Sequence, residues 1–368
     1  MPDNKRPYPM NYEINVTVSC TRYLPALSTM IALLAALVFP VPALAETDNG
    51  GWVQRAADRG QTSVHKKSDR LKRPLSRPKG SGSSVRKKDG PNLAWEAFDQ
   101  GRYLTALKEA KIAADRGEAE AHTLIGRIYS EGHGVPQNHQ VASEWFLKAA
   151  ELGDPLGSLQ AALLLAEGKG IKRDFKLAAK LFEASAKKGN LLAQYNLALL
   201  IADGRGRKTD FGQAAKWLNL AAKNGHAPAQ YDLGVLYAVG KGVPKDERKA
   251  AEWIGQAATQ GLPSAEVEYA VLLFKGRGIK RDQKRAYEFF RSSAHKGNPV
   301  AQNRLARLYA YGVVVEKNPI EAAKWHLISR EKGLSDGRMD MFLARMNNQQ
   351  MKTARDAASS WKKANAPR

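Results

Sequence analysis

Side chains that commonly supply nucleophiles, proton shuttles or metal ligands are sparse in this sequence. Cys20 is the only cysteine, so neither an internal disulfide nor a cluster of thiolates can form. Six of the seven histidines follow residue 90, namely His122, His133, His139, His226, His295 and His326. His133 and His139 flank one loop and could meet, but no cysteine or carboxylate spacing completes a metal site around them. We therefore expect these histidines to lie at the surface, and we predict no metal and no other cofactor.

Sequence motifs of catalytic sites are also missing. The chain contains no G-x-S-x-G, no H-E-x-x-H and no complete phosphate-binding loop. The short stretches GKG and GRG, at 168–170, 204–206, 240–242 and 276–278, look like fragments of such a loop. Because they recur at equal intervals, a structural role is favoured. The sequence therefore predicts a protein that is not an enzyme.

The feature that dominates the chain is a period of 36 residues. Glycine occurs at this interval without a miss, at 117, 153, 189, 225, 261, 297 and 333. Alanine does the same at 106, 142, 178, 214, 250, 286 and 322, and Asn or Asp at 138, 174, 210, 246, 282 and 318. An unbroken period of this length is typical of a solenoid, in which each unit buries its apolar face by stacking on its neighbours.

Each unit is predicted to be a hairpin of two helices. The recurring Gly follows a helical pattern, as Gly225 follows AAKWLNLAAKN, where a left-handed residue can end a helix. The recurring Asn or Asp precedes the next helix, as Asp210 does, where its side chain can cap free backbone amides. The recurring Ala, four residues later, is small enough to let two helices approach closely. Tryptophans at 145, 217, 253 and 325 share one position of the unit, which favours core packing over ligand stacking.

These residues together resemble the Sel1-like repeat, a relative of the tetratricopeptide repeat. The motif A-x-x-x-L-G/A-x-x-Y…G-x-G-V/I…D-x-x-x-A…W-x-x-x-A-A…G covers about 117–333. The resemblance implies an all-α fold, a right-handed α-solenoid of about six helix hairpins, and helix pairs at 91–116 and 334–368 are expected to cap its two ends. The short loop that joins the two helices of a unit, which we call the hinge, contains two glycines in most units. The chain departs from the pattern at Val314, which replaces the second of these glycines, and at Arg207, where an aliphatic residue is usual.

The first 45 residues have the layout of a secretory signal peptide. Arg22 precedes an apolar run at 30–38, and an A-x-A site at 43–45 precedes Glu46. We therefore expect a periplasmic or secreted protein, cleaved after Ala45. The alternative is an uncleaved membrane anchor, for which the apolar run is short.

The chain is strongly basic, with 58 Lys and Arg against 36 Asp and Glu and a net charge of +22 over 368 residues. Residues 46–90 are expected to be a disordered linker, because 61–90 combine many cations with few apolar groups. This linker is either a solvated spacer or a contact to an anionic envelope polymer or membrane surface. Because we expect export, we predict no DNA or RNA partner.

Sel1-like proteins generally act as adaptors, so the resemblance implies a non-catalytic scaffold that holds a protein partner on its concave face. The layout, including Trp-His-Leu at 325–327, is similar to that of exported Sel1-repeat regulators in alphaproteobacteria, which implies an envelope sensor or exopolysaccharide pathway. A β-lactamase-like enzyme is the remaining alternative. The Sel1-like proteins associated with β-lactam binding resemble a cysteine-rich subgroup, whose cysteines this chain lacks.

The helix before each hinge is expected to line the concave face, as in stacked tetratricopeptide units. The candidate partner-binding residues on it are Tyr195, Tyr231, Arg127, Leu163, Leu199, Val235, Val271 and Arg307. An apolar row with Arg at both ends would suit an amphipathic peptide with acidic ends. The alternative is that these residues pack between helices and that the groove is incidental.

Overall fold

The computed structural model describes residues 91–365, which form sixteen helices and no strand. The expected signal peptide (1–45) and linker (46–90) lie outside the described residues. Two helices, α3 (Pro91–Asp99) and α4 (Tyr103–Asp115), precede the repeats. Two more, α17 (Gly337–Ala344) and α18 (Asn348–Ala364), follow them.

Between these ends, the six predicted units form six hairpins of thirteen-residue helices. The first helices of the hairpins are α5 (Ala119–Glu131), α7 (Pro155–Glu167), α9 (Leu191–Asp203), α11 (Ala227–Val239), α13 (Pro263–Lys275) and α15 (Pro299–Tyr311). The second helices are α6 (His139–Glu151), α8 (Phe175–Lys187), α10 (Phe211–Lys223), α12 (Glu247–Thr259), α14 (Gln283–His295) and α16 (Pro319–Glu331). Each first helix packs against the second helix of its own unit and against the helix that precedes it. The predicted all-α solenoid is therefore confirmed.

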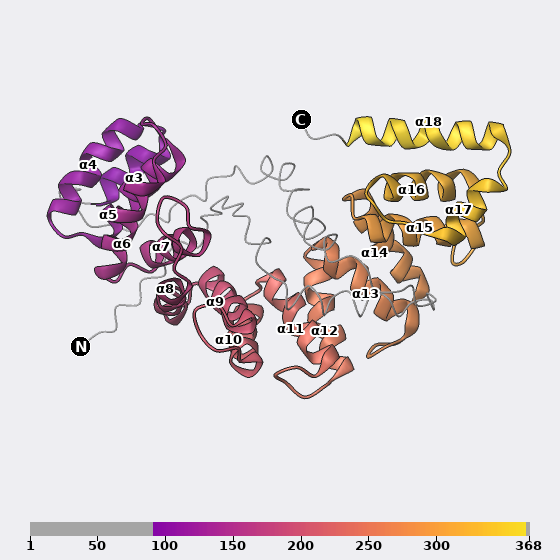
Figure 1. Cartoon of the computed structure of the whole chain (residues 1–368), viewed down its shortest axis with the longest axis horizontal. Coiled ribbons are helices and arrows are strands. Elements are labelled where there is room, and N and C mark those ends of the chain that lie inside the picture. Colours follow the sequence, from indigo (N-terminus) through magenta and orange to yellow (C-terminus); the bar gives the residue numbers. More distant parts are fainter. Residues whose placement is uncertain (1–90, 366–368) are drawn as a thin grey trace, which may run out of the picture.

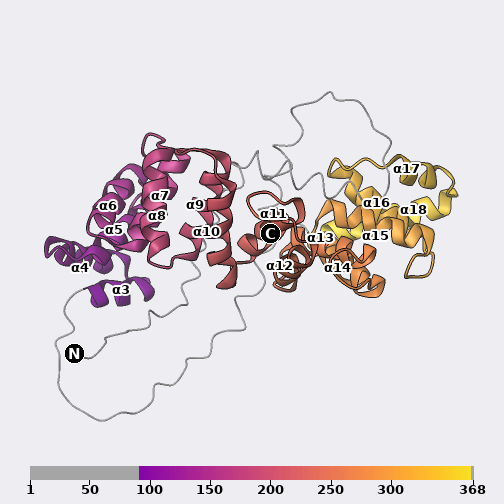
Figure 2. The ribbon, with the colours of Figure 1, turned by 90° about the horizontal axis from the view of Figure 1, so that it is seen from below.

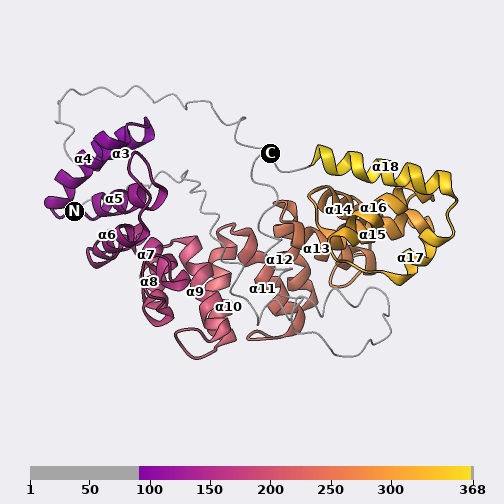
Figure 3. The same cartoon turned by 45° about the horizontal axis from the view of Figure 1, so that its top comes forward.

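The hairpins follow one another along an arc (Figure 1). The pair α3 and α4 lies at one end of the arc and α18 at the other, and both ends rise on the same side. Seen from below, the same hairpins form a continuous row (Figure 2), and the view turned by 45° keeps this order (Figure 3). Within residues 91–365, no helix is both long and apolar enough to cross a membrane.

Local signals in the sequence place the helix ends as predicted. The Asp174 side chain accepts hydrogen bonds from the backbone amides of Lys176 and Leu177, both at 2.9 Å, and the five equivalent Asn or Asp side chains cap their helices in the same way. The recurring glycines after the second helices have φ between 80° and 91°. Because side chains other than hydrogen are disfavoured there, glycine ends each second helix at a fixed residue.

The recurring alanines lie where the two helices of a unit meet. All seven are at most 1% exposed. In the fourth unit, a Cβ built on Gly234 of α11 would lie 3.1 Å from the carbonyl oxygen of Ala250 in α12, so the two backbones are close. Larger side chains at the alanine positions would force the helices apart.

This packing predicts that Ala214→Leu destabilises the protein far more than Lys216→Leu. Ala214 is fully buried in α10, and overpacking such a site typically costs about 1–3 kcal/mol, whereas Lys216 is exposed. Thermal unfolding of both variants measures the difference. Equal melting temperatures would show that the alanines do not face the helix contact.

Each hinge between the two helices of a unit contains a pair of left-handed residues. The first is always glycine, and the second, at Gly134, Gly170, Gly206, Gly242 and Gly278, has φ between 68° and 74°. From the second unit to the fifth, a Cβ at the second glycine would overlap the backbone of the first residue in the preceding unit's second helix. Gly278, for example, lies against the carbonyl of Glu247. The glycine is therefore required both by its own backbone angles and by contact between units.

The sixth hinge breaks this rule, as the sequence indicated. Val314 takes the place of the second glycine and keeps the same left-handed backbone, with φ of 73°. It is the one non-glycine residue with positive φ among the described residues. A β-branched side chain in this region is strained by roughly 1–3 kcal/mol.

We predict that Val314→Gly stabilises the protein by about 1 kcal/mol. Relief of the strained backbone outweighs the roughly 0.5–1 kcal/mol that glycine loses in chain entropy. The melting temperature should rise by about 2–4 °C. The matched reverse change, Gly278→Val, should lower it by several times as much, and a Val314→Gly variant that melts below the wild type would contradict the strain argument.

Candidate functional site

The apolar row expected to line a partner-binding groove is part of the core instead. Leu163, Leu199, Val235 and Val271 are 3, 7, 1 and 4% exposed, and they pack within the two large apolar clusters of the solenoid. Neighbouring units approach too closely to leave this position open. The row therefore provides interior contacts between units and very little surface for a partner.

The two arginines at the ends of the row are partly exposed and are held by local contacts. Arg127 donates from Nε to Oε1 of Glu131 at 3.0 Å, and its guanidinium lies 4.7 Å from the centre of the Phe98 ring. Arg307 donates from Nε to Oδ2 of Asp336 at 2.6 Å. Both guanidinium groups are therefore positioned by the protein at the two ends of the column of first helices.

The two tyrosines differ from each other. Tyr231 is 6% exposed and belongs to the core, whereas Tyr195 is half-buried. The hydroxyl of Tyr195 donates to Oδ2 of Asp232 at 3.0 Å, which links α9 to α11 in the next unit. The ring of Tyr195 also lies against His226, with 4.8 Å between centroids. Tyr195 is thus the aromatic residue of the predicted set that keeps some access to solvent.

A second row on the first helices carries polar groups that the sequence analysis did not select. It consists of Gln160, Asn196, Asp232, Glu268 and Arg304, one in each unit from the second to the sixth. Asn196, Asp232 and Glu268 are 5, 5 and 4% exposed. The signal was present in the sequence, because the first four of these residues each stand between two apolar residues at the same position of the repeat.

The two carboxyl groups of this row are desolvated. Burial raises the pKa of Asp232 to about 7, against the opposing effect of the hydrogen bond from Tyr195. Burial raises the pKa of Glu268 to about 7 as well, against the cations of Arg277, Lys275 and Arg304. Oε1 of Glu268 has no hydrogen-bond partner among the described residues. Burial therefore favours the protonated form of both acids.

Cations surround the C-terminal part of the same row. Burial lowers the pKa of Arg304 to about 10, and the neighbouring Arg307 acts in the same direction. Burial also lowers the pKa of Lys275, followed by the effects of Arg277 and Arg304. Acids and bases are thus gathered in a poorly hydrated strip along α11, α13 and α15.

The histidines are not uniformly at the surface, so that expectation was wrong for His122 and His326. They are 7 and 0% exposed. Nε2 of His326 lies 2.8 Å from Oδ1 of Asp340, so the Trp-His-Leu stretch belongs to the packing of the last unit. His133 stacks on Tyr103 at 4.5 Å between centroids and contacts Glu131, and no contact joins it to His139.

The tryptophans that share one position of the repeat pack against the apolar core. Trp217 and Trp253 are half-buried against the central apolar cluster, and Trp325 is 1% exposed. Trp325 donates from Nε1 to Glu321 at 2.9 Å and meets the Trp361 ring of α18 at 5.4 Å. Trp361 is thereby one of the residues that dock α18 on the last unit.

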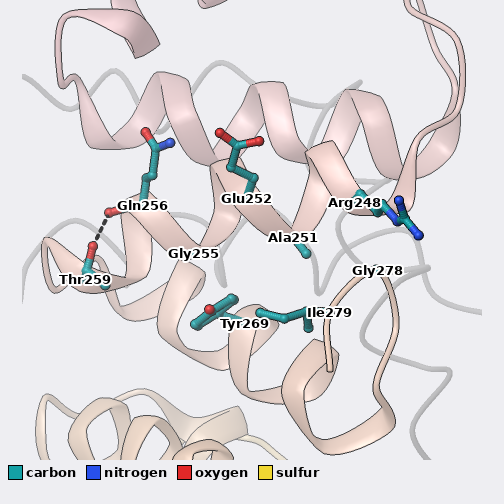
Figure 4. A pocket seen from close by; sticks show the side chains of 9 residues that line it. All are labelled: Arg248, Ala251, Glu252, Gly255, Gln256, Thr259, Tyr269, Gly278 and Ile279. Atoms are coloured by element: carbon teal, nitrogen blue, oxygen red, sulfur yellow. Dashed lines mark hydrogen bonds between the residues drawn. The ribbon is translucent and has the colours of Figure 1, made fainter. Parts of the chain in front are cut away.

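A pocket of about 370 Å³ opens beside α12 in the fourth unit (Figure 4). Its floor includes Tyr269 and Ile279, and Arg248 and Glu252 stand at its edge. Gly255, which lines the pocket, stands where the other units have a side chain, and the Tyr269 ring packs against it. A Cβ on Gly255 would lie 2.8 Å from the Tyr269 ring. The site offers apolar contact and hydrogen bonds but no nucleophile paired with a base.

The model of the Sel1 repeat family matches residues 119–154, 156–190, 191–226, 227–262, 263–298 and 299–334. These six segments coincide with the six hairpins. The chain belongs to the Sel1 repeat family. Sel1-repeat proteins are typically non-catalytic protein-interaction scaffolds.

Two solved structures support this assignment at the level of the fold. One is c5321, a protective antigen of uropathogenic Escherichia coli with an SLR fold, at 26% identity and a TM-score of 0.64, covering 73% of this chain. This chain covers 60% of the length of c5321. The other is a Sel1 repeat protein from Oxalobacter formigenes, at 28% identity and a TM-score of 0.60, covering 68% of this chain and 100% of that one. No curated protein matches the chain.

The buried acid of this Sel1-repeat protein gives a pH-dependent prediction. Asp232 has a higher pKa when folded than when unfolded, so the folded state loses stability as pH rises from about 4 to about 7. Asp232→Asn removes this loss. Its gain in stability should be on the order of 4 kcal/mol at pH 8 and should shrink as pH falls toward 5.

Asp246→Asn is the matched control for that measurement. Asp246 caps α12, and the amide of Lys249 with other hydrogen bonds holds its pKa below the ordinary value. Asn can also cap a helix, so this change should bring no gain at pH 8. Thermal unfolding between pH 5 and 8 compares the two variants, and an Asp232→Asn gain that is independent of pH would refute the desolvation argument.

Proposed function

We propose that this Sel1-repeat protein is a non-catalytic scaffold, exported to the periplasm, that binds a protein partner along its first helices. The observation that carries the proposal is the row of Asp232, Glu268 and Arg304. The fold does not need charge at this position, because the earlier units place Leu124, Gln160 and Asn196 there. Desolvated ionisable groups whose pKa values are strongly perturbed are concentrated at functional sites.

The binding surface we propose runs from Tyr195 through Asp232 and Glu268 to Arg304 and Arg307. Asp232 and Glu268 are as buried as the apolar row of the sequence analysis, so a partner would reach them through the half-buried side chains of Tyr195, Arg304 and Arg307 that belong to the same surface. A partner segment that brings hydrogen-bond donors to Glu268 would satisfy a carboxylate oxygen that the described residues leave without one. The layout of the chain favours an envelope regulator, such as a sensor protein or a component of an exopolysaccharide pathway, as the class of partner.

The test separates binding from stability. The double variant Asp232→Asn, Glu268→Gln keeps the shapes of both side chains and should melt at a higher temperature at pH 8. If the carboxylates bind the partner, capture in a crosslinking pull-down from periplasmic extract should fall at least about tenfold, the usual loss when a buried charge contact is removed. The control is Lys180→Gln with Lys216→Gln, on the exposed face of second helices.

Unchanged capture by the stabilised double variant would exclude this row as the partner site.

The same extract tests the export that the proposal requires. An intact mass that begins at Glu46 supports it, whereas a protein that retains its first 45 residues in the membrane fraction contradicts it.

A further inference from the structure

The four middle hinges of the solenoid are unusually rich in cations. The hinge rim, as we call residues 168–174, 204–210, 240–246 and 276–282, carries two or three Lys or Arg side chains in each hinge. They are Lys169, Lys172, Arg173, Arg205, Arg207, Lys208, Lys241, Lys245, Arg277, Lys280 and Arg281. The hinges at the two ends differ, because 132–138 contain no Lys or Arg and 312–318 contain Lys317 beside Glu316.

The acids of the hinge rim do not neutralise these cations. Each hinge contains one Asp, and that Asp caps the following helix through backbone amides. Arg207 and Arg277 pair with Glu183 and Glu247 of second helices, at 2.9 and 2.8 Å. Five further cations are exposed, and none of them lies within 4.0 Å of a carboxylate in the described part of the chain. They are Lys169, Lys172, Lys208, Lys280 and Arg281.

Helix stability explains only some of the hinge rim. Lys169, Arg205, Lys241 and Arg277 directly follow the C-terminal glycine of a first helix, where a cation interacts favourably with the helix dipole. Lys172, Lys208, Lys280 and Arg281 instead stand one or two residues before the cap of a second helix, near its positive end. A cation there is mildly unfavourable. These four are therefore not placed to stabilise the helices.

The spacing of the hinge rim is fixed by the backbone. Two left-handed glycines shape each hinge, and the second one rests on the preceding unit. The hinges between α11 and α12 and between α13 and α14 lie next to each other on the lower edge of the arc (Figure 1). The cations are thus presented at regular intervals along one edge, which matches a partner with anionic groups repeated along a chain.

Two features of the hinge rim argue against a single-stranded nucleic acid and against a membrane as its partner. Single-stranded nucleic acid would need open aromatic rings for stacking, but Arg205 lies 5.4 Å from the Phe175 ring and Lys241 lies 3.8 Å from the Phe211 ring. A membrane-inserting edge would need protruding apolar side chains, but Ile171, Val243 and Ile279 are half-buried toward the core. A flexible acidic polysaccharide needs neither feature.

We propose that the hinge rim binds an acidic polysaccharide, a chain of sugars bearing carboxylates, in addition to any protein partner of the first helices. The contacts are exposed ion pairs of modest individual strength that act together over four units. Binding should therefore weaken steeply as salt is raised.

The test uses the full chain and polygalacturonate as the probe. The rim variant carries Lys172→Gln, Lys208→Gln, Lys280→Gln and Arg281→Gln. The control variant loses the same charge from α8, α10 and their C-terminal ends, through Lys180→Gln, Lys188→Gln, Lys216→Gln and Lys223→Gln. We expect the rim variant to bind at least about tenfold more weakly and the control to change by less than about threefold. The rim variant should melt no earlier than the wild type, and the control slightly earlier, because it loses two cations at helix C-terminal ends.

Two results would overturn the proposal. Equal losses in both variants would show that net charge, including that of residues 61–90, attracts the polymer without a defined site. A rim variant that loses binding to vesicles containing phosphatidylglycerol, or to duplex DNA, while polygalacturonate binding is unchanged would assign the hinge rim to a different anion.

Discussion

From the second unit to the fifth, the solenoid depends on one backbone contact, in which the hinge rests on the first turn of the preceding unit's second helix. At Gly170, Gly206, Gly242 and Gly278 the approach leaves no room for a Cβ. The contact fixes the distance between successive units, and it requires their hinges to have the same shape. Helices of equal length and an unbroken period follow from it. In the last unit, Val314 carries a Cβ at the equivalent position and keeps the same left-handed backbone.

Features that depend on neighbouring residues in the chain could be predicted from the sequence. The caps at Asp174 and Asp210, the left-handed glycines and the buried alanines each follow from local geometry, and all were confirmed. The exposure of a helix face could not be predicted in this way. Leu163 and Val235 were expected on the groove, but how far units close over each other depends on the whole stack. The periodic pattern shows which residues are equivalent without showing how much solvent reaches them.

The row of Gln160, Asn196, Asp232, Glu268 and Arg304, which we call the polar row, was missed for the same reason, because burial depends on the whole stack. Asp232 and Glu268 stand at a position that the sequence analysis did not select. Their burial is a property of the assembled stack, as is the loss of stability that it causes at neutral pH. In these units the repeat therefore departs from what packing alone favours. A repeat protein makes such departures visible, because each unit serves as a reference for the others.

The two charged surfaces of the molecule obey different physical rules. Groups of the polar row are desolvated, so a partner must bring complementary groups in the right positions, and mismatched partners are penalised. Cations of the hinge rim remain in water, so they attract many polyanions weakly and are screened by salt. One surface lies on the first helices and the other on the loops that follow them, so occupation of one does not require the other to be vacant. A scaffold built in this way would concentrate on an acidic polymer through the hinge rim and select its protein partner through the polar row.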